Sequence, residues 1–464
     1  MELIAILTFL LYALVGYFSF HYMRYEENKF RYFLNYLLFG IGLGFFILGK
    51  EHVTIFSGVE LLGLSSLFLI SHYSNRERPI KNALYVVYFY KFADFILLIS
   101  FLLSYKNHPN LVLFGIITTS LIKSGAFPFC AWPSKAMEGP TPSSAIFYGS
   151  LALNIGPILI LKFENEILTH PMALSYLLIM GCLTYLYANI QSMIQTDAKS
   201  AVCYSSLSQI GLIFIELGFN LPTLATIHMF LNSYLKCIQM LKTPSLIHNY
   251  HYFSYQNNKI FCKHGIHFEN LLPKAIKQKL YFLALHHFHI DDFFSLISRG
   301  LNYYTQNKIF FILGMAISAA TKNFTLMLLF CSIGMLKEKN VYFFCGNFIL
   351  YNLLTCFLDY QNKISNLLVF TGVILTFIYV FILLKFPKQK VLIIILMLQF
   401  ANFPYLIESR MNEELLDYFI HHDDYIDMIL YGLSNTFFNI GMFHFIFYLI
   451  YLKRPARKEI FHFS

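Results

Sequence analysis

The stretch LVLFGIITTSLIKSGAFPF, residues 111–129, has the length and apolar character of a membrane-spanning helix, yet it contains Lys123 and Pro128. A cation at bilayer depth costs at least about 2.5–3.5 kcal/mol on insertion scales, and residues of this kind usually mark an ion or proton pathway. The stretch therefore predicts a spanning helix that is broken at Pro128 and carries a functional charge at Lys123.

Five further ionisable residues interrupt apolar runs in the same way. They are Glu60 in residues 53–70, Lys91 and Asp94 in residues 83–100, and His228 and Lys236 in residues 221–241. One buried charge can be an accident, whereas a series favours a relay. Asp94 follows Lys91 by three residues, so a local helical ion pair is the alternative interpretation for these two.

The composition is that of a polytopic membrane protein. Of 464 residues, 57% are hydrophobic and 13% are charged, against about 25% charged in ordinary soluble chains. The apolar runs are continuous over about 17–25 residues, which favours helices over the short alternating strands of a barrel. We therefore expect an all-α protein with about 13–14 transmembrane helices. The net charge of +9 lies mostly in short connections, so no nucleic-acid partner is predicted.

The predicted spans follow from these runs. They are 3–22, 32–48, 52–72, 83–104, 111–129, 142–162, 171–195, 199–216, 221–241, 341–358, 364–384, 391–407 and 425–452, with a less clear stretch at 309–336 interrupted by Thr321, Lys322 and Asn323. Every second connection is basic, which places the N-terminus outside and residues 242–308 inside. The later basic connections also lie inside only if residues 309–336 enter the membrane and return as a hairpin, or if this stretch is split.

The spans and connections divide the chain into four parts. These are N-terminal helices (1–50), a core (51–241), a polar amphipathic segment (242–308) and C-terminal helices (309–464). The polar segment holds seven histidines followed by Asp291 and Asp292, but their spacing matches no zinc motif, so no metal is predicted. The eight cysteines form no CxxC pair and are interpreted as small buried apolar residues. With no nucleotide motif or cluster-binding cysteines, no cofactor and no catalysis by this chain are expected.

The stretch KSGAFPFCAWPSKAMEGPTPSSAI, residues 123–146, resembles the signature of the antiporter-like subunits of respiratory complex I. Relatives of those subunits occur in multisubunit cation/proton antiporters, membrane hydrogenases and inorganic-carbon uptake complexes. Further matches follow in the family's order: GVELLGLSS around Glu60, YKFADF, TDAKSAVCYSSLSQIG and ATIHMFLNSYLK. The resemblance covers about residues 50–250 and weakly 398–452. It implies two inverted five-helix repeats, in 52–162 and 171–407, with a second broken helix near Pro404.

The resemblance also implies which residues conduct protons. Glu60, Lys123, His228 and Lys236 match the family's pattern, with Lys91, Asp94 and Lys199 flanking them. Glu60 and Lys123 are expected to face each other as a switch. Tyr148 and Asn232 stand where the family has histidines, and Asn412 where it has a lysine, so the distal half of the path departs from the family.

We therefore expect a proton-conducting membrane subunit that works with at least one other protein. A large complex I subunit continues into a long lateral helix, for which 464 residues leave little room. This favours an inorganic-carbon uptake complex in a bacterial inner membrane, with a cytoplasmic partner that resembles a zinc carbonic anhydrase. The alternatives are a pumping subunit of a complex I-like enzyme or hydrogenase, a cation/proton antiporter subunit, and a structural membrane anchor.

Overall fold

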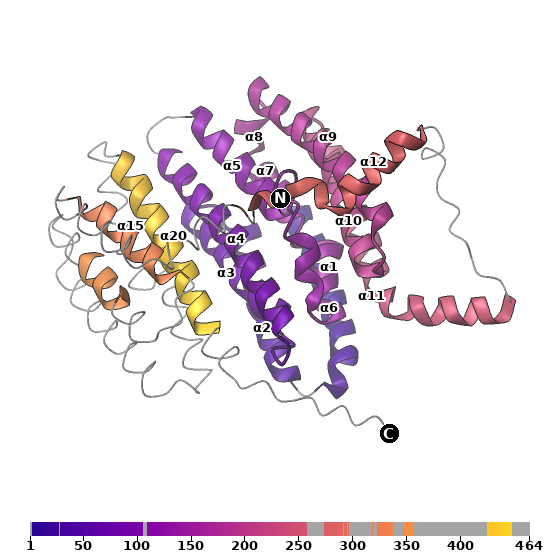
Figure 1. Ribbon diagram of the computed structural model, residues 1–464. Helices are drawn as coiled ribbons and strands as arrows, with labels where there is room; N and C mark the ends of the chain where they lie inside the picture. Colours follow the sequence, from indigo (N-terminus) through magenta and orange to yellow (C-terminus); the bar gives the residue numbers. More distant parts are fainter. Residues whose placement is uncertain are drawn as a thin grey trace. The chain divides into compact units, whose positions relative to one another are not determined.

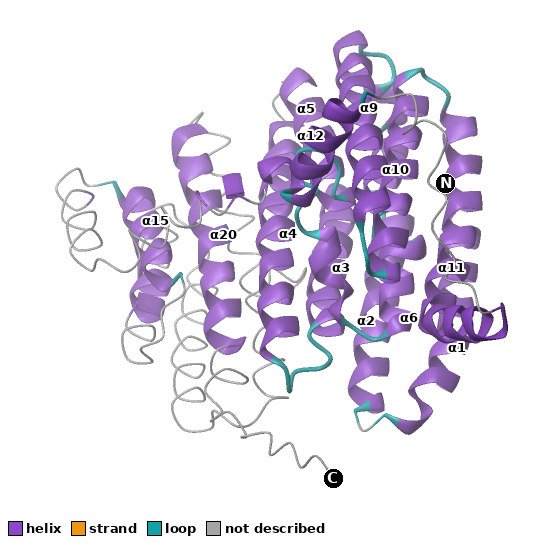
Figure 2. Ribbon diagram, turned by 45° about the vertical axis from the view of Figure 1, so that its right-hand side comes forward, coloured by secondary structure: helices purple, strands orange, loops and turns teal. Residues whose placement is uncertain are grey.

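The computed structural model is helical throughout the part of the chain that it describes, with no strand there (Figure 2). It describes residues 2–26, 28–104, 109–257, 273–290, 292–294, 296, 318, 323–336, 347–355 and 425–447. Two compact units divide the chain: Met1–Tyr73 with Tyr85–Gly300, and Ser74–Leu84 with Leu301–Ser464. Among the described residues, six helices are long and apolar enough to cross a membrane, which confirms the predicted all-α polytopic class.

The first unit is a bundle of helices (Figure 1). Its main helices are α1 (Glu2–Tyr22), α2 (Lys29–Leu48), α3 (His52–Ile70), α4 (Glu77–Ser104, from Tyr85 on), α5 (Pro109–Ser124), α9 (Pro171–Ile194), α10 (Ala198–Gly218) and α11 (Pro222–Asn257). Short elements lie between them: η1 (Met23–Tyr25), η2 (Pro133–Glu138), α6 (Thr141–Ser144), the π-helix η3 (Ala145–Ser150), α7 (Ile155–Lys162) and α8 (Glu164–Ile167). After α11 come α12 (Lys274–Leu285) and η5 (His287–His289).

Glycines allow close helix packing in this bundle. Helices α9 and α10 pack along their lengths (Figure 1), and a Cβ atom on Gly181 would lie 2.9 Å from the carbonyl oxygen of Gly211. A larger residue at either position would force the two backbones apart. The glycines thus fix α10, which carries several of the polar side chains described below.

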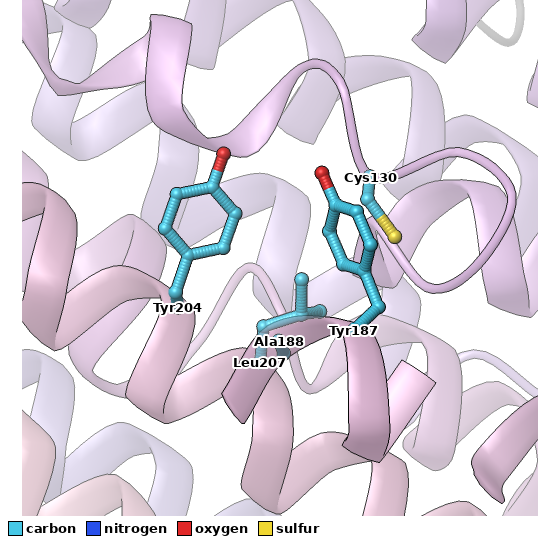
Figure 3. Packing of buried hydrophobic residues seen from close by; sticks show 5 residues of the cluster. All are labelled: Cys130, Tyr187, Ala188, Tyr204 and Leu207. Carbon is cyan, nitrogen blue, oxygen red and sulfur yellow. The ribbon is translucent and has the colours of Figure 1, made fainter. Parts of the chain in front are cut away.

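A small cluster of buried side chains lies where the chain after α5 meets α9 and α10. It consists of Cys130, Tyr187, Ala188, Tyr204 and Leu207. Figure 3 shows the rings of Tyr187 and Tyr204 with Cys130 beside them. Cys130 is free and fully buried, as expected for a cysteine that serves as a small apolar residue.

Two predicted spans are interrupted in the structure. The helix predicted over 111–129 ends at Ser124, four residues before Pro128. The span predicted over 142–162 is three short helices rather than one, because α6 passes into the π-helix η3 and the chain bends before α7. Pro157 explains part of this break, since it has no N–H to donate to the carbonyl group of Leu153.

The second unit contains α15 (Phe324–Met335), α20 (Tyr425–Phe447), the helical residues 347–355 and Ser74–Leu84 at the start of α4. The Asn323 side chain caps α15 by accepting a hydrogen bond from the Leu326 N–H, so the polar interruption predicted here is a helix start. Thr325 also joins α15 to Asp427 of α20. The predicted spans at 364–384 and 391–407, with Pro404 and Asn412, lie outside the described residues, so the count of 13–14 helices and the second repeat stay predictions.

Candidate functional site

Lys123 lies in the last turn of α5, where a glycine ends the helix. Gly125 has φ +65°, and it donates to Ile122 O at 3.1 Å while Ala126 donates to Leu121 O at 2.8 Å. These two bonds and the left-handed glycine are the Schellman ending of a helix. The Trp132 Nε1–H also donates to Ile122 O at 2.9 Å. The negative end of the helix dipole therefore lies beside the Lys123 backbone, where a cation is favoured.

The residue after Lys123 joins α5 to the break before α7. Ser124 Oγ donates to Leu153 O at 2.8 Å, and this is the carbonyl group that Pro157 leaves without its helical donor. The next residue, Asn154, donates from Nδ2 to Ser233 Oγ of α11 at 2.5 Å. Two buried hydrogen bonds, made at the neighbouring residues Leu153 and Asn154, thus connect the break before α7 with the end of α5 and with α11.

Four buried charges lie on helices α3, α4 and α5. The Lys123 ammonium is 2.5 Å from Asp94 Oδ1, and Lys91 pairs with Glu60. All four residues are between 2% and 6% exposed. Charges taken this far from water are tolerated only in pairs or networks. Helix α4 therefore presents a cation to α3 and an anion to α5, and the cluster carries no net charge.

The expected direct pairing of Glu60 with Lys123 is wrong in detail. Each residue has a partner on α4 instead, because Lys91 and Asp94, three residues apart, lie on one side of that helix. Glu60 still feels the charges of Asp94 and Lys123 as well as that of Lys91. The four groups are thus one electrostatic unit.

The contact between Lys123 and Asp94 is close without the angles of a hydrogen bond. Both carboxylate oxygens of Asp94 and the Nζ atom of Lys123 are buried and lack a hydrogen-bonding partner within the described residues. Lys123 Nζ also lies 4.6 Å from the centre of the Tyr90 ring, which packs edge-on against Trp132. These polar atoms have hydrogen-bonding capacity left for water or for a moving proton.

A second polar row runs between α10 and α11. Lys236 Nζ donates to Ser205 Oγ at 2.5 Å, and His228 Nε2 lies 3.0 Å from Gln209 Oε1. His228 Nδ1 lies 2.7 Å from Glu216 Oε1. Asn232 is buried between His228 and Lys236, one helical turn from each.

The remaining predicted residues lie elsewhere or are only partly defined. Lys199 is in the first turn of α10, next to Asp197, whose side chain accepts a hydrogen bond from the Ser200 N–H. Tyr148 is in the π-helix η3, and a π-helical turn is frequently found at functional sites. Pro128 follows a cis peptide bond in the chain after α5.

Glu216 is the polar residue of this row that sequence reasoning missed. It lies within GLIFIELGF, an apolar run at the end of a predicted span. The signal was the same as for Glu60, namely a carboxylate within an apolar stretch. It was overlooked because the predicted span ended at this residue, whereas α10 continues to Gly218.

The central part of the chain is similar to a known family and to curated proteins. Residues 50–263 match the family described as "NADH:quinone oxidoreductase/Mrp antiporter, TM". NADH-ubiquinone oxidoreductase chain 5 of Geomys personatus is 30% identical over 243 residues, 49% of this chain and 40% of the relative. The same subunit of Papio hamadryas is 31% identical over 268 residues, 54% of this chain and 44% of the relative.

The matched region is only part of each protein. The chain spans about two fifths of the length of the curated relatives that it matches. The solved structure of the Mrp complex from Dietzia sp. DQ12-45-1b is similar over 51% of this chain. The match covers 29% of the matched chain in that complex, at 21% identity and a TM-score of 0.47. That likeness is too low to define the fold.

Proposed function

Since residues 50–263 are an antiporter-type transmembrane domain of the NADH:quinone oxidoreductase/Mrp family, we propose that the chain is a proton-conducting membrane subunit of a larger assembly. The observation that carries the proposal is the cluster Glu60–Lys91 and Asp94–Lys123. Four charges inside a membrane bundle are costly, and a purely structural helix bundle has no need of them.

The alternating charges suit stepwise proton movement. A proton taken up by the Asp94 carboxylate forms an O–H bond and removes the negative charge that faces Lys123. The Lys123 ammonium then has no anionic partner in contact, which favours loss of its proton to water or to a neighbouring polar group. When Asp94 gives up its proton again, the pair can re-form. The switch expected between Glu60 and Lys123 thus operates through Asp94.

The path from the cluster leads toward α11. Ser124 and Asn154 follow Lys123 in space and connect to Ser233, which lies beside Asn232. From there, Lys236 and His228 lie on the same helix, one turn to either side of Asn232. We infer that water molecules along these side chains complete the route, since non-helical backbone is tolerated at membrane depth where it lines a hydrated cavity.

Two multisubunit assemblies are candidates for the one that contains this chain. The resemblance first suggested proton-driven inorganic-carbon uptake with a zinc protein as cytoplasmic partner. The relatives favour a complex I-like assembly, since they are NADH-ubiquinone oxidoreductase subunits. Purification of the tagged chain from its native membrane, followed by mass spectrometry, separates the two. Flavin or iron–sulfur subunits would support the redox assembly, and a zinc protein would support carbon uptake.

The conducting role itself is tested by reconstitution. The purified assembly in liposomes should move protons, measured with a pH-sensitive dye, and the Lys123→Ala and Glu60→Gln variants should not. Normal flux in both variants, with the assembly intact, would make the membrane-anchor alternative the better explanation.

A further inference from the structure

We propose that Glu216 and His228 form a proton-exchange site at the end of the path, where α10 turns into α11. The proposal deepens the conducting role and rests on it. Glu216 has no counterpart among the residues that the family resemblance assigned, and its role follows from the structure alone.

The imidazole ring of His228 is held from both sides. Its Nδ1 atom lies 2.7 Å from Glu216 Oε1, and its Nε2 atom lies 3.0 Å from Gln209 Oε1. Both partners come from α10, so the ring is fixed against the facing helix. The second carboxylate oxygen, Glu216 Oε2, is buried and accepts no hydrogen bond from any described residue. It is therefore available to accept from water or hydronium.

The site lies near one end of the two helices. Glu216 is two residues before the end of α10 at Gly218, and His228 is in the second turn of α11, which begins at Pro222. Their side chains are 19% and 22% exposed, against 2% for Lys123. Lys236 lies two turns further along α11. The pair thus lies between the buried part of the path and the surface. It is near the start of α11, far from residue 242.

The bonding around His228 can accommodate two protonation states. With Gln209 Oε1 facing Nε2, both ring nitrogens carry hydrogens and the ring is an imidazolium paired with Glu216. If the Gln209 amide turns over, its NH₂ group donates to an unprotonated Nε2 while Nδ1–H still donates to Glu216. A proton transferred from hydronium to Nε2 breaks one O–H bond and forms one N–H bond. In both arrangements Nδ1–H donates to Glu216 Oε1.

The neighbouring helix adds no competing charge. Helix α9, which packs along α10, has no Asp, Glu, Lys, Arg or His in its 24 residues. On the described part of α11, the nearest charged side chain is Lys236, which donates to the neutral Ser205 hydroxyl. Glu216 is therefore the anion in contact with His228.

The test uses the full assembly in liposomes, with Glu216→Gln, His228→Gln and the double variant. We expect each single variant to lower proton flux at least tenfold and the double variant to match His228→Gln, because the two side chains act as a unit. Glu216→Asp should recover part of the flux. The matched control is Glu166→Gln, which changes an exposed carboxylate in α8 to an amide outside the path.

A second readout reports on the histidine itself. With ¹⁵N-labelled histidine, the ring signals that disappear in His228→Gln belong to residue 228. We expect these signals to shift in Glu216→Gln, which loses the carboxylate beside Nδ1, and to stay unchanged in Glu166→Gln.

The outcomes separate this inference from the conducting role. Wild-type flux and unchanged His228 ring signals in Glu216→Gln, while Lys123→Ala is inactive, would overturn the exchange site alone. Normal flux in Lys123→Ala would instead overturn the conducting role on which the exchange site rests.

Discussion

The charge cluster on α3, α4 and α5 and the polar row between α10 and α11 handle buried charge in different ways. In the cluster, two anions and two cations pair across helices and are almost fully buried. In the row, Lys236 donates to a neutral hydroxyl, and the His228–Glu216 pair is partly exposed.

The difference shows where protons can be held and where they can be exchanged. An extra proton in the cluster neutralises one member of an ion pair and changes the electrostatic balance of all four groups. Such a response suits a switch. A proton added at His228 finds acceptors already in place on both ring nitrogens, which suits exchange with water. The predictions below test this division, beginning with the largest effect.

Neutralising one ion pair of the cluster should abolish function and leave the fold intact. In Lys123→Met with Asp94→Asn, no charge is left unpaired, so thermal stability in detergent should stay near that of the wild type. Proton flux should fall at least about a hundredfold, because neither residue can then hold or release the moving proton. Flux in liposomes and melting temperature measure the two effects. Substantial flux in this variant would show that the cluster is not part of the path.

Removing one member of a pair should destabilise the protein. Lys91 is 6% exposed and pairs with Glu60. Lys91→Met leaves Glu60 buried without its partner, so we expect a loss of about 3–5 kcal/mol in the free energy of unfolding. Adding Glu60→Gln should restore most of it. Denaturation by SDS measures both, and a stable single variant would contradict the pairing.

Ser124→Ala should have a smaller effect on stability and flux. The change removes the hydrogen bond to Leu153 O, a buried carbonyl group, at a cost of about 1–3 kcal/mol. The matched control is Ser120→Ala, whose hydroxyl donates only to Ile116 O one turn back in the same helix. If both substitutions cost the same, the polar link from α5 to the break before α7 has no special role.

The smallest expected effect is a pH dependence outside the path. His72, just after α3, is buried close to the positive charge of Arg31, and burial first and Arg31 second lower the pKa of its imidazole to about 4. The unfolded state then binds more protons between about pH 6.5 and pH 4, so stability should fall as pH falls through this window. The loss is at most about 1.4 kcal/mol per pH unit. His72→Gln should flatten the melting temperature between these pH values, and an unchanged slope would contradict the assignment.

The sequence predicted the class of fold and the buried charges, because both follow from hydropathy along the chain. It did not predict the pairing, since the partners of Lys91 and Asp94 depend on how α3, α4 and α5 are rotated and ordered. Gly125 ends α5, although Pro128 was the expected break, because a glycine in the left-handed region suffices to stop a helix.

Pro157 indicates the break before α7 in the sequence, but it lies within an apolar run that predicts one continuous span. Glu216 was missed for a related reason, because the predicted span ended on that residue. Both cases show that an apolar run gives the presence of a helix more reliably than its end.

Helix α11 carries His228 and Lys236 and continues to Asn257, giving it 36 residues and a length of about 54 Å at 1.5 Å per residue. The hydrocarbon layer is only about 30 Å thick. Pro244 lies in the part beyond, where Thr243 Oγ1 donates to Met240 O, the carbonyl group that lacks the proline N–H. Figure 1 shows the helix turning and running on at a large angle. The far section is about 20 Å long, so if the two sections move together, a rotation of the first section by about 10° would displace its tip by several ångströms. A displacement driven by charge near His228 could therefore be delivered as movement at a distance from the membrane interior.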